Sequence, residues 1–227
     1  VMGTGAPWLR GRVLAFGRPG GLPPCGGRAA GLALLRSLWP RAAAGRGQVV
    51  GVVGGPGVGK SRLLHELCLG LLREGATVVA GQCVSYGQAT PYLPLGEPLR
   101  CLCGIEAGAP PAALHRTARL TIDRLELSQT DDLPLLLGLL GTTDPRPERS
   151  SARPAAPDPQ ALTARTFELL RRLIAKSAPT GPLLLALEDL HWIDATTNEW
   201  LELLAHGLAP IPALLLPTHP PGHPPPW

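Results

Sequence analysis

Lysine is nearly absent from this chain of 227 residues: of its 21 basic residues, only Lys60 and Lys176 are lysines. The arginines are scattered, no basic run of five or more residues occurs, and the formal net charge is only +4. These features give no indication of a nucleic-acid-binding surface. No apolar run approaches the ~20 residues of a membrane span. Arg10 and Arg12 interrupt the region where a signal peptide would carry its apolar segment. We therefore expect a cytoplasmic protein that binds neither nucleic acid nor membrane directly.

Cysteine is also scarce. The five cysteines are Cys25, Cys68, Cys83, Cys101 and Cys103, an odd number that contains no C-x-x-C pair. This pattern argues against a disulfide framework and against a zinc site, and it favours unpaired thiols in a reducing compartment. Apolar residues make up 44% of the chain, which is enough at this length to bury the core of one domain.

The most informative stretch covers residues 48–64 and contains the pattern G-x-x-x-x-G-K-S at residues 54–61. Before the pattern, residues 49–53 form a β-branched run that is typical of a buried parallel strand. After it, Lys60–Arg73 carries leucines at helical spacing. A strand, a glycine-rich turn and a helix are the context in which this pattern binds phosphate. A glycine-rich turn without a ligand is the simpler alternative, but the two flanking elements favour phosphate binding.

The residue types of this loop suit the phosphates of a nucleotide. Glycines let the backbone curl so that several N–H groups converge on one anion, and the helix that begins near Gly59 adds the positive end of its dipole. Lys60 would place its charge on the β- and γ-phosphates, where it would also assist catalysis, and Ser61 would offer its hydroxyl to Mg²⁺. The predicted binding residues of this stretch are Gly54, Gly55, Pro56, Gly57, Val58, Gly59, Lys60, Ser61 and Arg62.

A second candidate site is a pair of carboxylates, Glu188 and Asp189, directly after an apolar run at residues 183–187. In phosphate-loop enzymes, such a strand end holds one acid that faces Mg²⁺, often through water, while a neighbouring acid can polarise the attacking water. We therefore predict Glu188 as the metal-side acid and Asp189 as the catalytic base. The alternative is that two solvated acids merely end the strand. Two residues further on, the role of His191 stays undecided: it could contact the phosphates or act as a capping residue. Trp192 is expected in the core.

Hydrophobic periodicity predicts alternating strands and helices along the chain, and therefore an α/β fold with parallel strands and right-handed crossovers. Helices are expected at residues 32–38 (ending before Pro40), 60–73, 95–103, 111–127, 133–140, 160–177 and 195–208, and strands at residues 49–53, 77–80, 183–187 and 212–216.

The organisation into segments follows from composition. We expect residues 1–24 to be a linker or disordered and residues 25–227 to form one domain, with a mobile, proline-rich loop at 141–159. Residues 81–94 are a polar loop after the second strand, at the edge where ligands sit in open α/β sheets. A ligand-binding role and a plain surface loop remain open for that segment.

Four segments together resemble the AAA-type ATPase domain of signalling proteins: residues 27–28, 47–64, 81–95 and 187–194. Such STAND-like P-loop NTPase domains are attached to class III adenylate/guanylate cyclases and to some large bacterial transcriptional regulators. The resemblance covers residues 22–227. It implies a three-layer α/β/α fold with a mostly parallel sheet, ATP or ADP with Mg²⁺ as cofactors, and ATP hydrolysis that drives a conformational switch. It also implies a fused or associated effector domain, helical repeats in the full-length protein and nucleotide-dependent oligomers.

The resemblance adds site residues and reveals departures. Gly27 and Arg28 would lie near the adenine, and Thr218 would be a polar sensor at the end of the fourth strand. In the family this strand ends in a Thr-Tyr-Arg-like run whose arginine senses phosphate, whereas this chain has Pro220 at the arginine position. Gly31 replaces an acidic residue. Losing a contact of this kind can cost about 10³-fold or more in rate. Binding is thus the firmer expectation, and a nucleotide-binding switch or scaffold that does not hydrolyse ATP is the alternative.

The strand order of the fold that this chain resembles is 5-1-4-3-2. Because the chain ends soon after its fourth strand, we expect the order 1-4-3-2, with the fifth strand and the helical lid missing. Residues 49–53 would then form an edge strand whose outer side is unpaired.

Overall fold

The computed structural model describes residues 29–142, 158–177, 181–223 and 225. Its helices are α1 (Ala29–Ala43), α2 (Lys60–Arg73), α3 (Gly96–Cys103), α4 (Pro111–Arg124), α5 (Asp132–Leu139), α6 (Pro159–Ser177) and α7 (Ala195–Gly207), and its strands are β1 (Gln48–Val49), β2 (Val52–Val53), β3 (Thr77–Gln82), β4 (Leu183–Glu188) and β5 (Ala213–His219). Short 3-10 helices lie at Ser85–Gly87, Leu93–Leu95 and Leu190–Trp192. The predicted linker, Gly27, Arg28 and most of the predicted proline-rich loop lie outside the described residues. None of the helices described is long and apolar enough to cross a membrane.

All strand pairs are parallel, and the order across the sheet is β1, β5, β4, β3, with β2 also pairing with β5. This order confirms the predicted arrangement 1-4-3-2. Within the described ranges, β1 and β2 pair with β5 alone. The segment that contains β1 and β2 therefore lies at the sheet edge, as predicted. Val49 and Val53 are 38% and 56% exposed. The prediction that residues 49–53 are a buried strand is therefore wrong. Val50 and Val52 pack with residues of α1 and α2, whereas Val49 and Val53 occupy the alternate positions and point to the opposite face of the sheet, where they are exposed.

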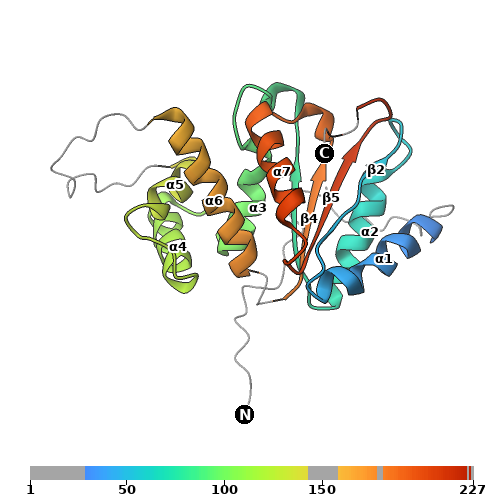
Figure 1. Cartoon of the computed structure of the whole chain (residues 1–227), viewed down its shortest axis with the longest axis horizontal. Coiled ribbons are helices and arrows are strands. Elements are labelled where there is room, and N and C mark those ends of the chain that lie inside the picture. The colour runs from blue at the N-terminus through green and yellow to red at the C-terminus, as the bar shows by residue number, and fades with distance from the viewer. Residues whose placement is uncertain (1–28, 143–157, 178–180, 224, 226–227) are drawn as a thin grey trace, which may run out of the picture.

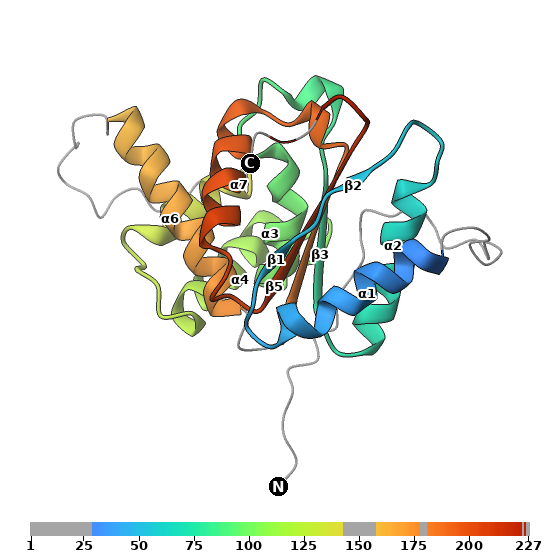
Figure 2. The same ribbon diagram turned by 45° about the vertical axis from the view of Figure 1, so that its right-hand side comes forward.

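Helices cover both faces of the sheet, with α1 and α2 on one face and α3 to α7 on the other (Figures 1 and 2). Side chains that alternate along the strands accordingly divide the core into two layers. Leu185 and Leu187 of β4 pack with residues of α3 to α7. Leu184 and Ala186 point the other way and pack with α1 and α2. This is the expected three-layer α/β/α arrangement. The period of two along a strand also assigns Glu188, the next even position, to the face that α2 covers.

Helix α1 is longer than predicted, because it continues through Pro40 to Ala43. Trp39 and Ala42 are buried in the same core layer as residues of α2. The carbonyl of Pro40 still accepts the N–H of Ala44 at 3.0 Å. Burial of these side chains compensates for the hydrogen bond that a proline removes from a helix.

The predicted strand at residues 49–53 is divided into β1 and β2. Both strands pair with β5 in one register, since Val49 lies opposite Leu215 and Val52 opposite Thr218. In that register Gly51 lies opposite Pro217, which has no N–H to donate to the ladder. The division is thus a local loss of hydrogen bonding within one extended segment.

Candidate functional site

The loop between β2 and α2 has the curled backbone that its glycines predict. Gly57 and Gly59 have φ angles of 71° and 80°, a left-handed conformation that is costly for residues with a Cβ. Gly59 is the N-cap of α2 and provides no side-chain hydrogen bond to the helix. N–H groups in the first turn of α2 therefore have no side-chain acceptor at the cap, which is the arrangement that binds anions.

Lys60 spans this loop. Its ammonium donates hydrogen bonds to the carbonyl oxygens of Gly54 at 2.8 Å and Gly55 at 3.1 Å. The N–H of Gly54 donates to the carbonyl of His219 at 3.2 Å, so that the start of the loop is fixed to the end of β5. Phosphate oxygens would replace the two carbonyls as acceptors for Lys60, because an anion is the stronger partner of an ammonium group.

Glu188 ends β4 on the face of α2 and is only 6% exposed. Its pKa is raised, chiefly because burial disfavours the charged carboxylate, and the charge of Asp189 adds to the rise. A hydrogen bond from the Ser61 hydroxyl and the charge of Lys60 act in the opposite direction. The strand end and the start of α2 thus meet at one point, where a hydroxyl and a carboxylate face each other.

This pair of oxygen donors fits Mg²⁺, a hard cation that prefers oxygen ligands and retains several waters. A cation there would also favour the ionised form of Glu188, whose burial otherwise favours the proton. The described residues contain no group of three or more His, Cys, Asp or Glu side chains that could hold a metal ion. Ser61 and Glu188 would accordingly hold Mg²⁺ together with phosphate oxygens and water.

Asp189 is held by residues from two neighbouring strands. Its backbone is left-handed, with φ 55° and ψ 45°. Its N–H donates to the hydroxyl of Thr218 at 3.1 Å, and its Oδ2 accepts from Nε2 of Gln82 at 3.5 Å. Thr218 is fully buried. The carboxylate of Asp189 therefore has a defined partner at the carboxyl edge of the sheet.

Gln82 is a site residue that the sequence analysis missed. It is the last residue of β3, and the parallel register places it opposite Glu188. The available signal was the position: the final residue of a parallel strand next to the acidic strand reaches the same sheet edge. Sequence periodicity alone does not state which strands are neighbours.

The other predicted residues take several positions. Pro56, Gly57 and Val58 are exposed at the tip of the loop. The guanidinium Nε of Arg62 donates to Glu66 at 3.2 Å along α2, so this side chain is engaged within its own helix. The structure thus brings the loop, Lys60, Ser61, Glu188, Asp189 and Thr218 to one edge, and it describes no position for Gly27 and Arg28.

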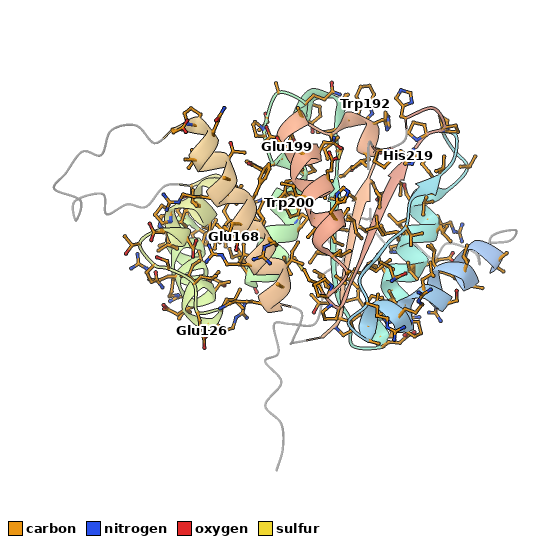
Figure 3. All side chains as sticks on the ribbon, in the orientation of Figure 1. Glu126, Glu168, Trp192, Glu199, Trp200 and His219 are labelled. Atoms are coloured by element: carbon orange, nitrogen blue, oxygen red, sulfur yellow. The ribbon has the colours of Figure 1, made fainter. Side chains whose placement is uncertain are left out.

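Figure 3 shows Trp192 and His219 at this same edge of the sheet. Trp192 is 38% exposed, so the expectation that it belongs to the core is wrong, and the buried tryptophan of this region is Trp200, in α7. His191 packs its ring 4.8 Å from that of Trp192, and its Nδ1 is buried without a hydrogen-bond partner among the described residues. His219 is buried, and its Nδ1 donates to the carbonyl of Pro220 at 2.9 Å.

Comparison with known proteins adds two findings. A family model described as "AAA ATPase domain" matches residues 24–216. An uncharacterized protein of Rhizobium meliloti (strain 1021) is 30% identical over 216 residues, which are 95% of this chain and 20% of that protein. The chain thus spans about a fifth of the length of the curated relative that it matches.

Proposed function

The chain belongs to the AAA ATPase domain family, and on that premise we propose that it is the ATP-binding module of a signalling protein. It binds Mg-ATP through the loop at residues 54–61, and in the full-length protein it hydrolyses ATP slowly to drive a conformational switch. The observation that carries this proposal is the position of Lys60, whose ammonium binds the carbonyls of Gly54 and Gly55 in the loop and whose charge acts on the buried carboxylate of Glu188 at the end of β4.

Each residue has a role that its present partner indicates. Lys60 leaves the carbonyls of Gly54 and Gly55 and binds the β- and γ-phosphates. Ser61 and Glu188 would hold Mg²⁺, which would neutralise phosphate charge. Asp189, whose carboxylate is oriented by Gln82, accepts a hydrogen bond from the attacking water and takes its proton.

A second candidate function is a nucleotide-binding switch or scaffold that does not hydrolyse ATP and regulates a fused cyclase or transcription-regulator domain. The observation that favours it is the end of β5. Pro220 stands where the family has a phosphate-sensing arginine, and the ring of the preceding His219 is bound to the carbonyl of Pro220. Neither side chain brings a permanent positive charge to the phosphates, so the chain itself stabilises the transition state less.

Two assays separate these functions: calorimetry measures Mg-ATP binding, and a second assay measures phosphate release. Both are applied to the wild type, Lys60→Ala and Asp189→Asn. Lys60→Ala should weaken Mg-ATP binding by about 100-fold, which corresponds to the loss of roughly one strong charge-assisted hydrogen bond. Asp189→Asn should retain binding and lose phosphate release; asparagine tolerates the left-handed backbone at this position. Binding without turnover in the wild type supports the switch, and binding that is insensitive to Lys60→Ala overturns both.

The proposed effector has a separate test in the coding sequence that adjoins this chain. The expected result is a cyclase or transcription-regulator domain in the same reading frame. A different type of domain would overturn this part of the proposal and leave the nucleotide site unaffected.

A further inference from the structure

The hydroxyl of Thr197 joins two segments that are distant in the sequence. Thr197 lies in the first turn of α7 and is fully buried. Its Oγ1 donates to Oδ2 of Asp194 at 2.6 Å and accepts the backbone N–H of Tyr92 at 2.9 Å. Asp194, the N-cap of α7, also accepts the N–H of Thr197 at 2.8 Å. A cap needs only the bonds to Asp194, whereas the bond to Tyr92 holds the loop that follows β3.

This loop returns to β3 directly beside Gln82. Two residues after Tyr92, Pro94 packs so closely on Gly81 that a Cβ at Gly81 would overlap the Pro94 carbonyl oxygen. The next residue of β3, Gln82, donates to Oδ2 of Asp189. Fixing Tyr92 therefore also fixes the backbone that carries the partner of Asp189.

The contacts form a closed ring at the carboxyl edge of the sheet. Asp189 is connected to Asp194 through the 3-10 helix Leu190–Trp192. From there the ring runs through Thr197 to Tyr92 and, by way of Pro94 and Gly81, back to Gln82 and Asp189.

Backbone conformation gives independent support. Three non-glycine residues of the described ranges have positive φ, and two of them, Tyr92 at 64° and Asp189 at 55°, are members of this ring. Such conformations are energetically unfavourable for residues with a Cβ and persist only where the surrounding structure determines them. Thr197 supplies one of the bonds that hold Tyr92 in this conformation.

We propose that Thr197 is a positioning residue for Asp189, acting through the Tyr92 loop and Gln82. The inference rests on the proposed function, in which Asp189 activates the attacking water. Removing the Thr197 hydroxyl leaves the Tyr92 N–H and one oxygen of Asp194 without partners. The loop then moves away from α7, and Gln82 no longer orients Asp189. Because no member of this ring lies in the phosphate loop, nucleotide affinity stays unchanged while turnover falls.

The test compares Thr197→Val, which has the same shape but no hydroxyl, with Thr197→Ser, which keeps the hydroxyl. Thr196→Val is the matched control, since Thr196 is the neighbouring threonine of α7. In Thr197→Val, kcat for phosphate release should fall about tenfold, the effect of a small displacement of a positioned group. The dissociation constant for Mg-ATP should stay within about twofold, as expected for a change that affects only the transition state. Thr197→Ser and Thr196→Val should both match the wild type.

Amide hydrogen exchange provides a readout that does not depend on turnover. In Thr197→Val, exchange should accelerate at Tyr92 and also at Cys83 and Asp189, whose N–H groups bind Glu188 and Thr218. If exchange accelerated only at Tyr92 and at the start of α7, Thr197 would have a capping role alone, and the inference would be overturned. Loss of kcat in Thr197→Ser equal to that in Thr197→Val would overturn it too. Wild-type protein without Lys60-dependent Mg-ATP binding would instead overturn the proposed function, and the exchange pattern would still decide whether Thr197 holds Asp189.

Discussion

Replacing Gly81 by alanine should destabilise the fold more than its small change in volume indicates. Gly81 is buried in β3, and the added Cβ would overlap the carbonyl oxygen of Pro94. It would also lie 3.0 Å from Cδ2 of Leu187 and 3.1 Å from Cγ of Pro98. The leucine side chain can rotate away. The Pro94 carbonyl is backbone, so it moves only if the segment that Tyr92 anchors moves with it.

The expected cost follows from that difference. Overpacking a well-packed core costs typically 1–3 kcal/mol, and a backbone obstacle places Gly81→Ala at the upper end, about 3 kcal/mol. For a domain of this size, 1 kcal/mol shifts Tm by about 2–4 °C. We therefore expect Gly81→Ala to lower Tm by about 6–12 °C.

Gly138→Ala is the matched control, because the same chemical change should have the opposite sign there. Gly138 lies in helix α5, is exposed, has no positive φ, and its added Cβ meets no atom within 4 Å. Alanine in a helix is favoured over glycine by about 0.5–1 kcal/mol, which predicts a small rise in Tm.

Thermal and urea unfolding, followed by far-ultraviolet circular dichroism, measure both variants against the wild type. The urea midpoint should fall for Gly81→Ala and rise slightly for Gly138→Ala, with unchanged slopes. A Gly81→Ala protein whose Tm lies within about 1 °C of the wild type would refute this reasoning about the Pro94 contact.

Three further predictions concern buried ionisable groups. The pKa of Glu188 is raised by burial, so its contribution to stability is present at acid pH and lost as the pH rises through the folded-state pKa; Glu188→Gln should raise Tm at neutral pH, by a margin that shrinks on acidification, and weaken Mg-ATP binding. Asp132→Ala should lower the free energy of unfolding by about 2–3 kcal/mol, because Arg172 loses two hydrogen bonds of 3.0 and 2.6 Å; urea unfolding checks this. Burial raises the pKa of Cys68 and Cys103 to about 12, so both thiols should react with a disulfide reagent only after unfolding; rapid labelling of the native protein would contradict this.

The order of the sheet could be predicted from the sequence, because runs of leucine and valine report burial and the family resemblance supplied their neighbours. Boundaries that depend on tertiary contacts could not. Pro40 is a helix breaker by local rules, yet burial of Trp39 and Ala42 carries α1 past it. The break between β1 and β2 depends on Pro217, which is far away in the sequence and becomes a neighbour only through pairing.

The same limit applies to the site. Lys60, Ser61 and Glu188 could be predicted because each belongs to a local pattern with a fixed chemistry. Gln82 and Thr197 belong to no such pattern, and each acts through a hydrogen bond to a residue that the topology brings near. The sequence also did not predict the burial of individual side chains, since Trp192 was expected in the core and is exposed.

A nucleotide switch in this chain does not require turnover, because the groups that would bind Mg-ATP lie beside Glu188. Lys60 binds two loop carbonyls, and its charge and the Ser61 hydroxyl both act on the carboxylate of Glu188. Mg-ATP in the loop would bring new charges close to that carboxylate, so occupancy would change the environment of Glu188 whether or not phosphate is released. Glu188 is bonded through its carbonyl to Cys83 and precedes Asp189, both of which adjoin the Thr197 contacts. We therefore expect binding alone to change amide exchange at Cys83, whose N–H binds the Glu188 carbonyl. Exchange measured on the wild-type protein with and without Mg-ATP should show this change whether or not the protein releases phosphate.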